Sequence, residues 1–147
     1  MGPGDKIRVD VYGEPDLSIE ALIDATGTVN YPLLGRLTVQ GLTLKEFEQL
    51  VVRRLSEGYL VNPSVRVVMM QFRPFYVTGQ VNRVGAYPYV EGLTVEKALA
   101  LAGGMTNIAS TRKIYILREG LLNQRERATF TSPVYPGDTI VVDESLF

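Results

Sequence analysis

The chain contains no cysteine and no histidine among its 147 residues. The absence of cysteine excludes disulfide bonds and thiol nucleophiles. The two absences together remove the usual zinc ligands and the side chain that most often transfers a proton near neutral pH. The sequence therefore argues against an enzyme that uses a thiol or an imidazole, although the lack of cysteine does not choose between cytoplasm and periplasm.

The chain also lacks an excess of charge and any long apolar run. Fifteen Lys and Arg against sixteen Asp and Glu give a net charge of −1. The general attraction to phosphate backbones is missing, so we expect no nucleic-acid partner. No apolar run approaches the ~20 residues of a membrane helix. Residues 1–4 lead directly into a predicted strand without a signal peptide, so we expect a soluble chain whose export signal is cut off or never existed.

What is present is typical of a folded protein. Apolar residues make up 46% of the chain and charged residues 21%, which suits one ordinary domain or two small ones. Pro74 interrupts what would otherwise be one overlong strand. We therefore place a domain boundary at Arg73-Pro74, between residues 1–73 and 74–147.

The second half of the chain contains the clearest succession of elements. Apolar and polar residues alternate over Phe75–Val81, which predicts a strand with a buried face, and Ala86–Val90 predicts a second strand after a turn. Thr94 can cap a helix, which Gly103 and Gly104 would end. Further strands are predicted over Thr111–Leu117, Leu121–Thr131 and Thr139–Val142.

The first half predicts one capped helix among short strands. Lys6–Tyr12 alternates and is typical of a half-exposed strand. Thr43 and Glu46 form a capping box, which predicts a helix to about Glu57. Ser64–Phe72 is apolar on both faces and predicts a central strand. Three more short strands are predicted over Ile19–Asp24, Thr28–Tyr31 and Arg36–Val39.

Two short patterns recur in the two halves. Gly41–Lys45 is echoed by Gly92–Glu96 before a predicted helix, and Gly4–Ile7 is echoed by Gly137–Ile140 before a predicted strand. These repeated patterns are either turn and capping sequences that are common in proteins or the mark of two related α+β modules in tandem.

Several motifs follow one another in a specific order. In the second half, G-Q-V-x-x-x-G-x-Y from Gly79 and A-G-G-M-T from Ala102 resemble the SLBB (soluble-ligand-binding β-grasp) domain. In the first half, G-D-K-I-R-V, V-Y-G-E-P-D-L-S, Y-P-L-L-G-R and Y-L-x-N-P resemble the polysaccharide export domain of the Wza-like outer-membrane polysaccharide export proteins. An export domain followed by an SLBB domain is that family's own order.

The resemblance implies an α+β fold of two small tandem modules. Residues 1–73 would form the polysaccharide export domain and residues 74–147 the β-grasp domain. The positions that carry the motifs or the turns are Gly4, Asp5, Pro32, Gly35, Arg36, Asn62, Pro63, Gly79, Gly85, Gly103, Gly104, Gly137 and Asp138.

The resemblance also implies a place and partners. It implies a periplasmic lipoprotein that forms a homo-oligomeric ring, through which capsular or extracellular polysaccharide leaves the cell, and that works with an inner-membrane polysaccharide co-polymerase. The chain has one SLBB module, no lipidated cysteine and nothing after Phe147 that matches the pore helix of longer members. We therefore expect attachment to the outer membrane through a lipid on a missing N-terminus, and a pore supplied by another protein such as an outer-membrane β-barrel.

Four carboxylates near the N-terminus could suggest the acid pair of a glycosidase, namely Asp5, Asp10, Glu14 and Asp16. Asp5 is echoed by Asp138 at a turn that enters a strand, which favours hydrogen bonds to the backbone. Asp10 shares a strand face with Lys6 and Arg8, which favours a solvated charge ladder. We expect no catalytic residue among them.

Tyrosines and arginines are the candidates for contact with a polymer. Tyr31 and Tyr87 could offer flat rings to sugars, although most tyrosines are expected in the core or at subunit interfaces. Arg53 and Arg54 could line the path of an anionic polymer or face a neighbouring subunit, with a solvated surface as the default. Gly103-Gly104 follows a helix, the reverse of a phosphate loop, and we expect no cofactor and no metal.

These observations favour a non-catalytic component of polysaccharide export. The alternative is a monomeric β-grasp module that binds a small molecule or a glycan. An enzyme is disfavoured. The mass in solution separates the first two, because a ring former associates.

Overall fold

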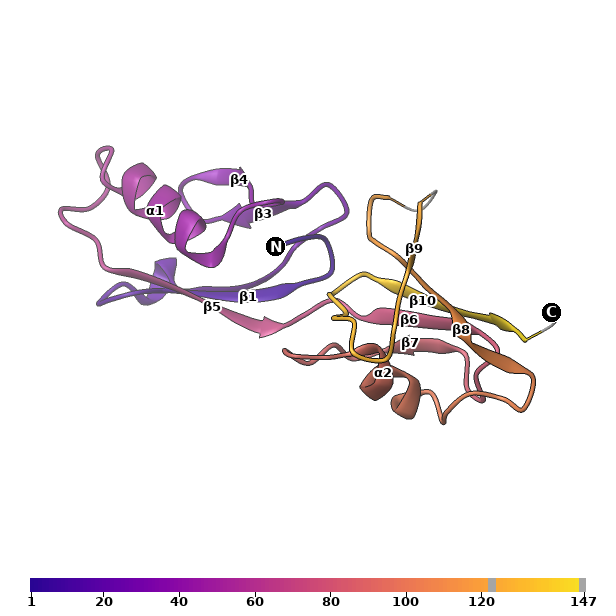
Figure 1. Cartoon of the computed structure of the whole chain (residues 1–147). Helices are drawn as coiled ribbons and strands as arrows, with labels where there is room; N and C mark the ends of the chain where they lie inside the picture. Colours follow the sequence, from indigo (N-terminus) through magenta and orange to yellow (C-terminus); the bar gives the residue numbers. More distant parts are fainter. Residues whose placement is uncertain (122–123, 146–147) are drawn as a thin grey trace. The chain divides into compact units, whose positions relative to one another are not determined.

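The computed structural model of the chain describes residues 1–121 and 124–145. The chain divides into two compact units, Met1–Arg73 and Pro74–Phe147. Each unit combines strands with one α-helix (Figure 1). The predicted α+β class with two tandem modules is confirmed.

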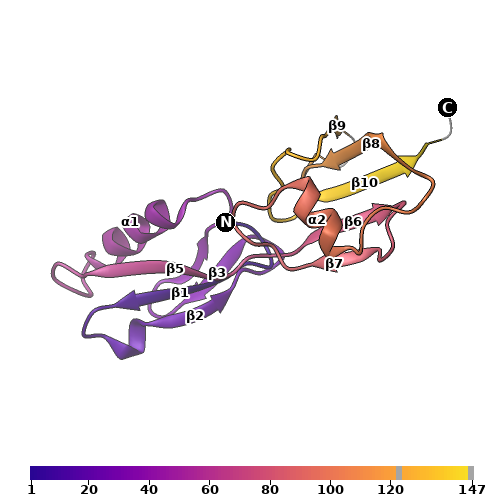
Figure 2. The ribbon, with the colours of Figure 1, turned by 60° about the horizontal axis from the view of Figure 1, so that its bottom comes forward.

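The N-terminal unit is built on a three-stranded antiparallel sheet, in which β1 lies between β2 and β5. A hairpin of β3 and β4 and the helix α1 complete the unit, and α1 runs alongside β5 in both ribbon views (Figures 1 and 2). The elements are β1 (Lys6–Val11), the 3-10 helix η1 (Pro15–Leu17), β2 (Ile19–Leu22), β3 (Thr28–Tyr31), β4 (Gly35–Thr38), α1 (Leu44–Leu55) and β5 (Val65–Gln71).

One face of β1 is buried and the other is charged, as its alternation predicts. On the charged face, Arg8 Nε lies 3.2 Å from Asp10 Oδ2, and Lys6 Nζ lies 3.6 Å from Glu20 Oε2 on β2. These partly exposed pairs form the predicted charge ladder. The opposite face joins the core through Ile7, Val9 and Val11.

The start of α1 follows from local chemistry. The Thr43 N–H donates to Glu46 Oε1 at 2.9 Å, and the Glu46 N–H donates to Thr43 Oγ1 at 3.1 Å, so the predicted capping box is confirmed in both directions. The helix ends two residues before the predicted Glu57. Its fully buried residues are Phe47, Val51 and Leu55.

Strand β5 corrects one prediction. It pairs with β1 alone and is therefore an edge strand, not a central one. Its apolar residues on both faces misled the prediction, because only Val67 is fully buried and Met70 is 43% exposed. The side chain of Glu48 on α1 accepts a hydrogen bond from the Val67 N–H at 3.0 Å. This bond satisfies a backbone donor that an edge strand would otherwise expose.

The C-terminal unit is a five-stranded sheet in the order β7-β6-β10-β8-β9. Central β10 runs parallel to β6 and antiparallel to β8, and α2 packs on one face of the sheet. This is the arrangement of a β-grasp fold. The elements are β6 (Phe75–Gly79), β7 (Gly85–Tyr87), α2 (Val95–Leu101), β8 (Ala109–Leu117), β9 (Arg125–Arg127) and β10 (Thr139–Glu144).

Two predicted strands are shorter than expected. β7 stops at Tyr87, because Pro88 has no N–H to continue a ladder. The strand predicted over Leu121–Thr131 contains only β9, whose three residues are all exposed. Beyond β9 the Thr129 N–H donates to Ser132 Oγ at 2.9 Å and closes a turn. Residues 122–123 of that predicted strand lie outside the described residues.

The Asp24 carboxylate organises the turn between β2 and β3. It accepts hydrogen bonds from the hydroxyls of Thr26 (2.6 Å) and Thr28 (2.9 Å) and from both of their N–H groups. These bonds, above all that of the Thr26 hydroxyl, hold the pKa of the Asp24 carboxyl well below its ordinary value. Arg36 Nη2 lies 3.4 Å from Asp24 Oδ2 and adds an exposed ion pair.

Replacing Asp24 with asparagine should lower stability in a pH-dependent way. Because the pKa of Asp24 is depressed in the folded state, its stabilising effect is present above the unfolded pKa, near 4, and is lost as the pH falls through the lower folded value. Urea midpoints measured from pH 7 to pH 2 should therefore converge for the parent and Asp24→Asn below about pH 4. Asp16→Asn, at an exposed position, is the matched control. A constant difference across this range contradicts the assignment.

Candidate functional site

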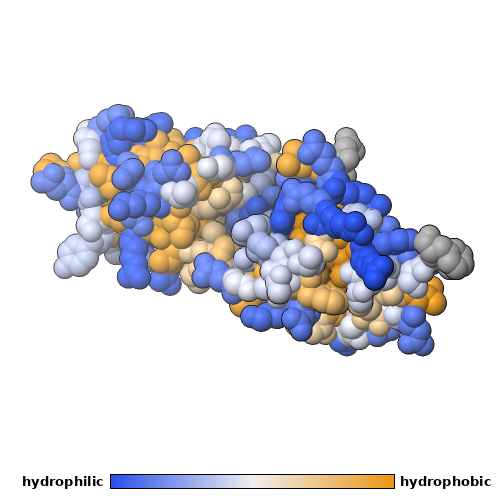
Figure 3. Space-filling view, viewed as in Figure 1, coloured by the Kyte–Doolittle hydropathy of each residue, from blue (hydrophilic) through white to orange (hydrophobic). Residues whose placement is uncertain are grey.

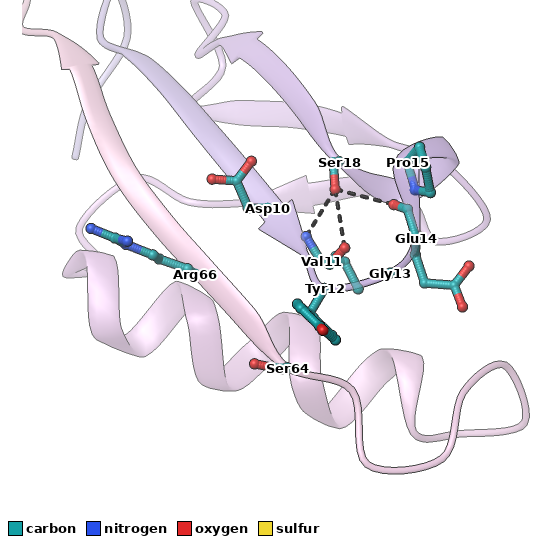
Figure 4. Close-up of a pocket in the computed structure, with 9 residues that line it drawn as sticks. All are labelled: Asp10, Val11, Tyr12, Gly13, Glu14, Pro15, Ser18, Ser64 and Arg66. Carbon is teal, nitrogen blue, oxygen red and sulfur yellow. Dashed lines mark hydrogen bonds between the residues drawn. The ribbon is translucent and has the colours of Figure 1, made fainter.

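An open pocket of about 500 Å³ lies where β1 ends. The segment V-Y-G-E-P-D-L-S builds one wall of it, since the 3-10 helix turns the chain from β1 into β2. Ser18 holds this turn: its Oγ accepts from the Val11 N–H at 2.9 Å and lies 3.1 Å from the Glu14 carbonyl oxygen, to which it can donate (Figure 4). The serine that closes the sequence motif is therefore explained by the backbone it fixes.

The pocket offers polar groups and one aromatic ring. Asp10, Glu14 and Arg66 line it together with Tyr12. Tyr12 is 88% exposed, and its N–H donates to the Ser64 carbonyl oxygen at 3.0 Å. An exposed ring beside polar groups suits weak contact with a sugar.

Two of the carboxylates near the N-terminus, Asp5 and Asp10, have cationic partners. Figure 4 shows the side chains of Asp10 and Glu14 pointing in different directions, and Asp10 pairs with Arg8. Asp5 precedes the start of β1, five residues from Asp10, which corresponds to roughly 16 Å along an extended strand. Acid pairs in glycosidases lie within about 9.5 Å of each other. Asp5 and Asp10 are therefore too far apart along β1 to form such a pair.

Two buried carboxylates occupy matching P-G-D turns, one in each unit. Asp5 is 1% exposed and accepts hydrogen bonds from the Gly2 N–H at 3.0 Å and the Arg73 N–H at 2.7 Å. Arg73 Nη1 also lies 2.7 Å from Asp5 Oδ2. The turn before β1 is thereby fixed to the residue that ends the N-terminal unit.

Asp138 repeats the arrangement before β10. It is 2% exposed, accepts from the Tyr135 N–H at 2.7 Å and pairs with Arg118. Burial raises the pKa of Asp138, and the Tyr135 and Arg118 bonds oppose that rise. In both turns the carboxylate bonds an N–H three residues earlier, so the echo in the sequence corresponds to one shared local structure.

The other motif positions lie in turns and at the ends of elements. Pro32 lies in the β3–β4 turn, Gly35 opens β4, and Asn62 and Pro63 lead into β5 with Asn62 at φ 48°. Gly79 ends β6 and Gly85 opens β7. Gly103 and Gly104 follow α2, and the Gly103 carbonyl accepts a hydrogen bond from Asn82 Nδ2 at 2.7 Å. The motif glycines with positive φ are Gly4, Gly35, Gly79, Gly85, Gly103, Gly104 and Gly137.

Comparison with known families covers both units. Residues 1–70 match the family described as polysaccharide biosynthesis/export protein, and residues 74–127 match the SLBB domain. The chain belongs to the Wza-like polysaccharide export family. The export match lies within the N-terminal unit, and the SLBB match lies within the C-terminal unit.

Two curated proteins are similar in sequence to this chain. Exopolysaccharide production protein ExoF of Rhizobium meliloti (strain 1021) is 35% identical over 85 residues, 56% of this chain and 20% of that protein. Polysialic acid transport protein KpsD of Escherichia coli is 30% identical over 107 residues, 71% of this chain and 19% of that protein. The chain thus spans about a fifth of the length of the curated relatives it matches.

The two tyrosines proposed to face a polymer or a neighbouring subunit have partners within this chain. Tyr31 is 2% exposed, and its hydroxyl donates to the Leu17 carbonyl at 2.6 Å. Burial raises the pKa of Tyr31 to about 12. The structure therefore places Tyr31 in the core, where its ring meets no polymer. Tyr87 is half-buried, its ring centroid 5.9 Å from that of Phe75, and its hydroxyl donates to the Arg83 carbonyl.

The two arginines lie in the last turn of α1. Arg53 is exposed and Arg54 is half-buried, so both side chains reach the surface of the domain. Their positive charges interact favourably with the negative C-terminal end of the helix dipole. Among tyrosines, sequence reasoning gave too little weight to Tyr12 and Tyr76, which are 88% and 44% exposed. The signal for Tyr12 was its place in the predicted strand Lys6–Tyr12, where the alternation puts it on the same side as Lys6, Arg8 and Asp10.

Neither helix in the described part of the chain has the length and apolarity needed to cross a membrane. The described residues also contain no cluster of three or more Asp and Glu that could hold a metal ion.

Proposed function

We propose that the chain is a non-catalytic component of polysaccharide export that assembles with copies of itself into a periplasmic ring. Capsular or extracellular polysaccharide passes through this ring on its way across the outer membrane. The observation that carries the proposal is the succession of an export domain and an SLBB domain along most of the chain.

Two further observations support the proposal. The names of the relatives concern exopolysaccharide production and polysialic acid transport. Two of the carboxylates near the N-terminus, Asp10 and Asp5, are held in ion pairs with Arg8 and Arg73. A protein that conducts a polymer needs weak and repeated contacts, and an exposed ring such as Tyr12 supplies contacts of that kind.

The proposed partners follow from the family. An inner-membrane polysaccharide co-polymerase would deliver the polymer to the ring. A lipid on an N-terminal extension would hold the ring at the outer membrane, and a separate protein such as an outer-membrane β-barrel would supply the pore.

Deleting the gene in its own host tests the transport role. We expect surface polysaccharide to fall by at least about tenfold while polymer of normal length collects in the periplasm, because export fails after synthesis. Immunoblots of surface and periplasmic fractions measure both quantities, and complementation with the full gene should restore export. Unchanged surface polysaccharide, or shorter polymer in the presence of the purified protein, contradicts the proposal.

The solution mass tests the ring. Sedimentation velocity at increasing protein concentration should show reversible association of the intact chain, with lipid vesicles shifting it to larger species if a lipidated form is used. A protein that stays monomeric in every condition and binds a small molecule or glycan favours the alternative of a monomeric β-grasp module.

A further inference from the structure

A second open pocket, of about 500 Å³, lies on the SLBB domain beside β8 and β9. Its lining includes three cationic residues and three hydroxyls, and none of the lining residues is Asp or Glu. We refer to it as the basic pocket, formed by Ser110, Thr111, Arg112, Lys113, Arg127 and Ser145. Figure 3 shows strongly hydrophilic side chains gathered over β9 and the adjoining part of β8.

Arg127 is held in a fixed orientation in this pocket. Its Nε and Nη2 donate to the Arg112 carbonyl oxygen at 3.1 and 2.6 Å. These bonds use two of the five N–H groups of the guanidinium. The remaining N–H groups can bind two oxygen atoms of one anion, either a carboxylate or a phosphate, and arginine commonly binds both anions in this bidentate way.

The neighbouring carboxylates serve other partners. Asp143 accepts from Arg125 at 3.4 Å, and Arg125 stacks on the Tyr115 ring with 4.4 Å to its centroid. Glu144 lies 3.5 Å from the Gln80 amide nitrogen. Arg125 is therefore paired with a carboxylate, whereas the lining of the basic pocket contains both Arg112 and Arg127 and no carboxylate. A pocket lined by arginines and by no carboxylate favours the approach of an anion.

We propose that the basic pocket binds an anionic group, a carboxylate or a phosphate, of an acidic saccharide polymer. The polymer as ligand rests on the proposed export function, whereas the preference for an anion rests on the pocket alone. The hydroxyls of Ser110 and Thr111 can donate to the same group or to adjacent sugar hydroxyls. The site is open, so it suits weak contacts that a moving chain makes and breaks.

Titration of the intact ¹⁵N-labelled chain tests this site. Hexagalacturonate supplies carboxylates, inorganic tripolyphosphate supplies phosphates, and maltohexaose is the neutral control. We expect amide shifts at residues 109–113, 127 and 145 with one or both anions at millimolar concentration. Added NaCl should weaken the binding, because ion pairs in an open pocket are screened. Whichever anion binds identifies the group that the site takes.

Matched variants separate this site from general charge. Arg112→Gln should weaken anion binding by about tenfold and the double variant with Arg127→Gln should abolish it, whereas Arg112→Lys keeps most of it. Arg83→Gln removes an equal charge from an exposed position outside the pocket and should leave binding unchanged. Equal binding of maltohexaose, no binding of either anion, or undiminished binding by the folded double variant overturns the site. Export by the double variant at the normal level would then leave the proposed function standing.

Discussion

Val67→Asp is expected to unfold the export domain and leave the SLBB domain folded. Val67 is 4% exposed, on the face of β5 that meets the core. An unpaired carboxylate buried there costs several kcal/mol, against a total stability of roughly 5–15 kcal/mol for a domain. The Glu48 carboxylate already lies 3.0 Å from the Val67 nitrogen, so the new charge also meets one of the same sign. A ¹⁵N–¹H spectrum of the intact chain should lose dispersion for residues 1–73 only.

The matched control is the same substitution at an exposed valine. Val61 is 91% exposed, in the loop between α1 and β5. Val61→Asp should therefore keep the parent spectrum and melting temperature. A dispersed export-domain spectrum for Val67→Asp would show that this face of β5 does not meet the core.

The elements that the sequence predicts correctly depend on contacts between near neighbours. The capping box of Thr43 and Glu46 needs only residues three apart, and both of its bonds are present. The alternation of β1 encodes which face is buried, since side chains on a strand alternate between its two faces. The confirmed α+β class follows from such local patterns taken in order.

The features that it misses depend on residues far apart in the chain. β5 was expected in the centre of its sheet, but strand order is set by long-range pairing, and nothing local shows that β1 takes the middle place. The bond from Val67 to Glu48 spans 19 residues and the pair of Asp5 with Arg73 spans 68. Apolar residues on both faces can equally mark an edge strand partly covered by a helix.

The candidate sites divide in the same way. The turn residues of V-Y-G-E-P-D-L-S were recognised as a motif, and their hydrogen bonds through Ser18 are local. The basic pocket was missed, because the Arg127 side chain reaches the Arg112 carbonyl oxygen only through the pairing of β8 with β9, which are separate in the sequence. Tyr31 was overvalued, since its burial depends on the packing of the β3–β4 hairpin against the core.

Gly79→Ala is expected to destabilise the SLBB domain far more than an alanine at another glycine of similar backbone conformation. Gly79 has φ +90° and faces Val142 of β10 in the parallel β6–β10 pair. A Cβ there would lie 3.0 Å from both the backbone N and C of Val142 and closer still to its carbonyl oxygen. That oxygen accepts from the Gln80 N–H at 2.8 Å, so the strands must separate at a hydrogen bond that joins them.

Gly92→Ala isolates this clash from the cost of the backbone conformation. Gly92 has φ +81°, and a Cβ there meets nothing within 4 Å, so its substitution costs only about 1–2 kcal/mol for a left-handed alanine. In a domain of this size each kcal/mol lowers the melting temperature by about 4–8 °C. Calorimetry of the intact chain should place the SLBB transition of Gly79→Ala at least about 10 °C below that of Gly92→Ala. Equal melting temperatures for the two variants would mean that β6 and β10 can move apart at Gly79 without cost. Close packing against β10 would then not explain the glycine of the G-Q-V motif.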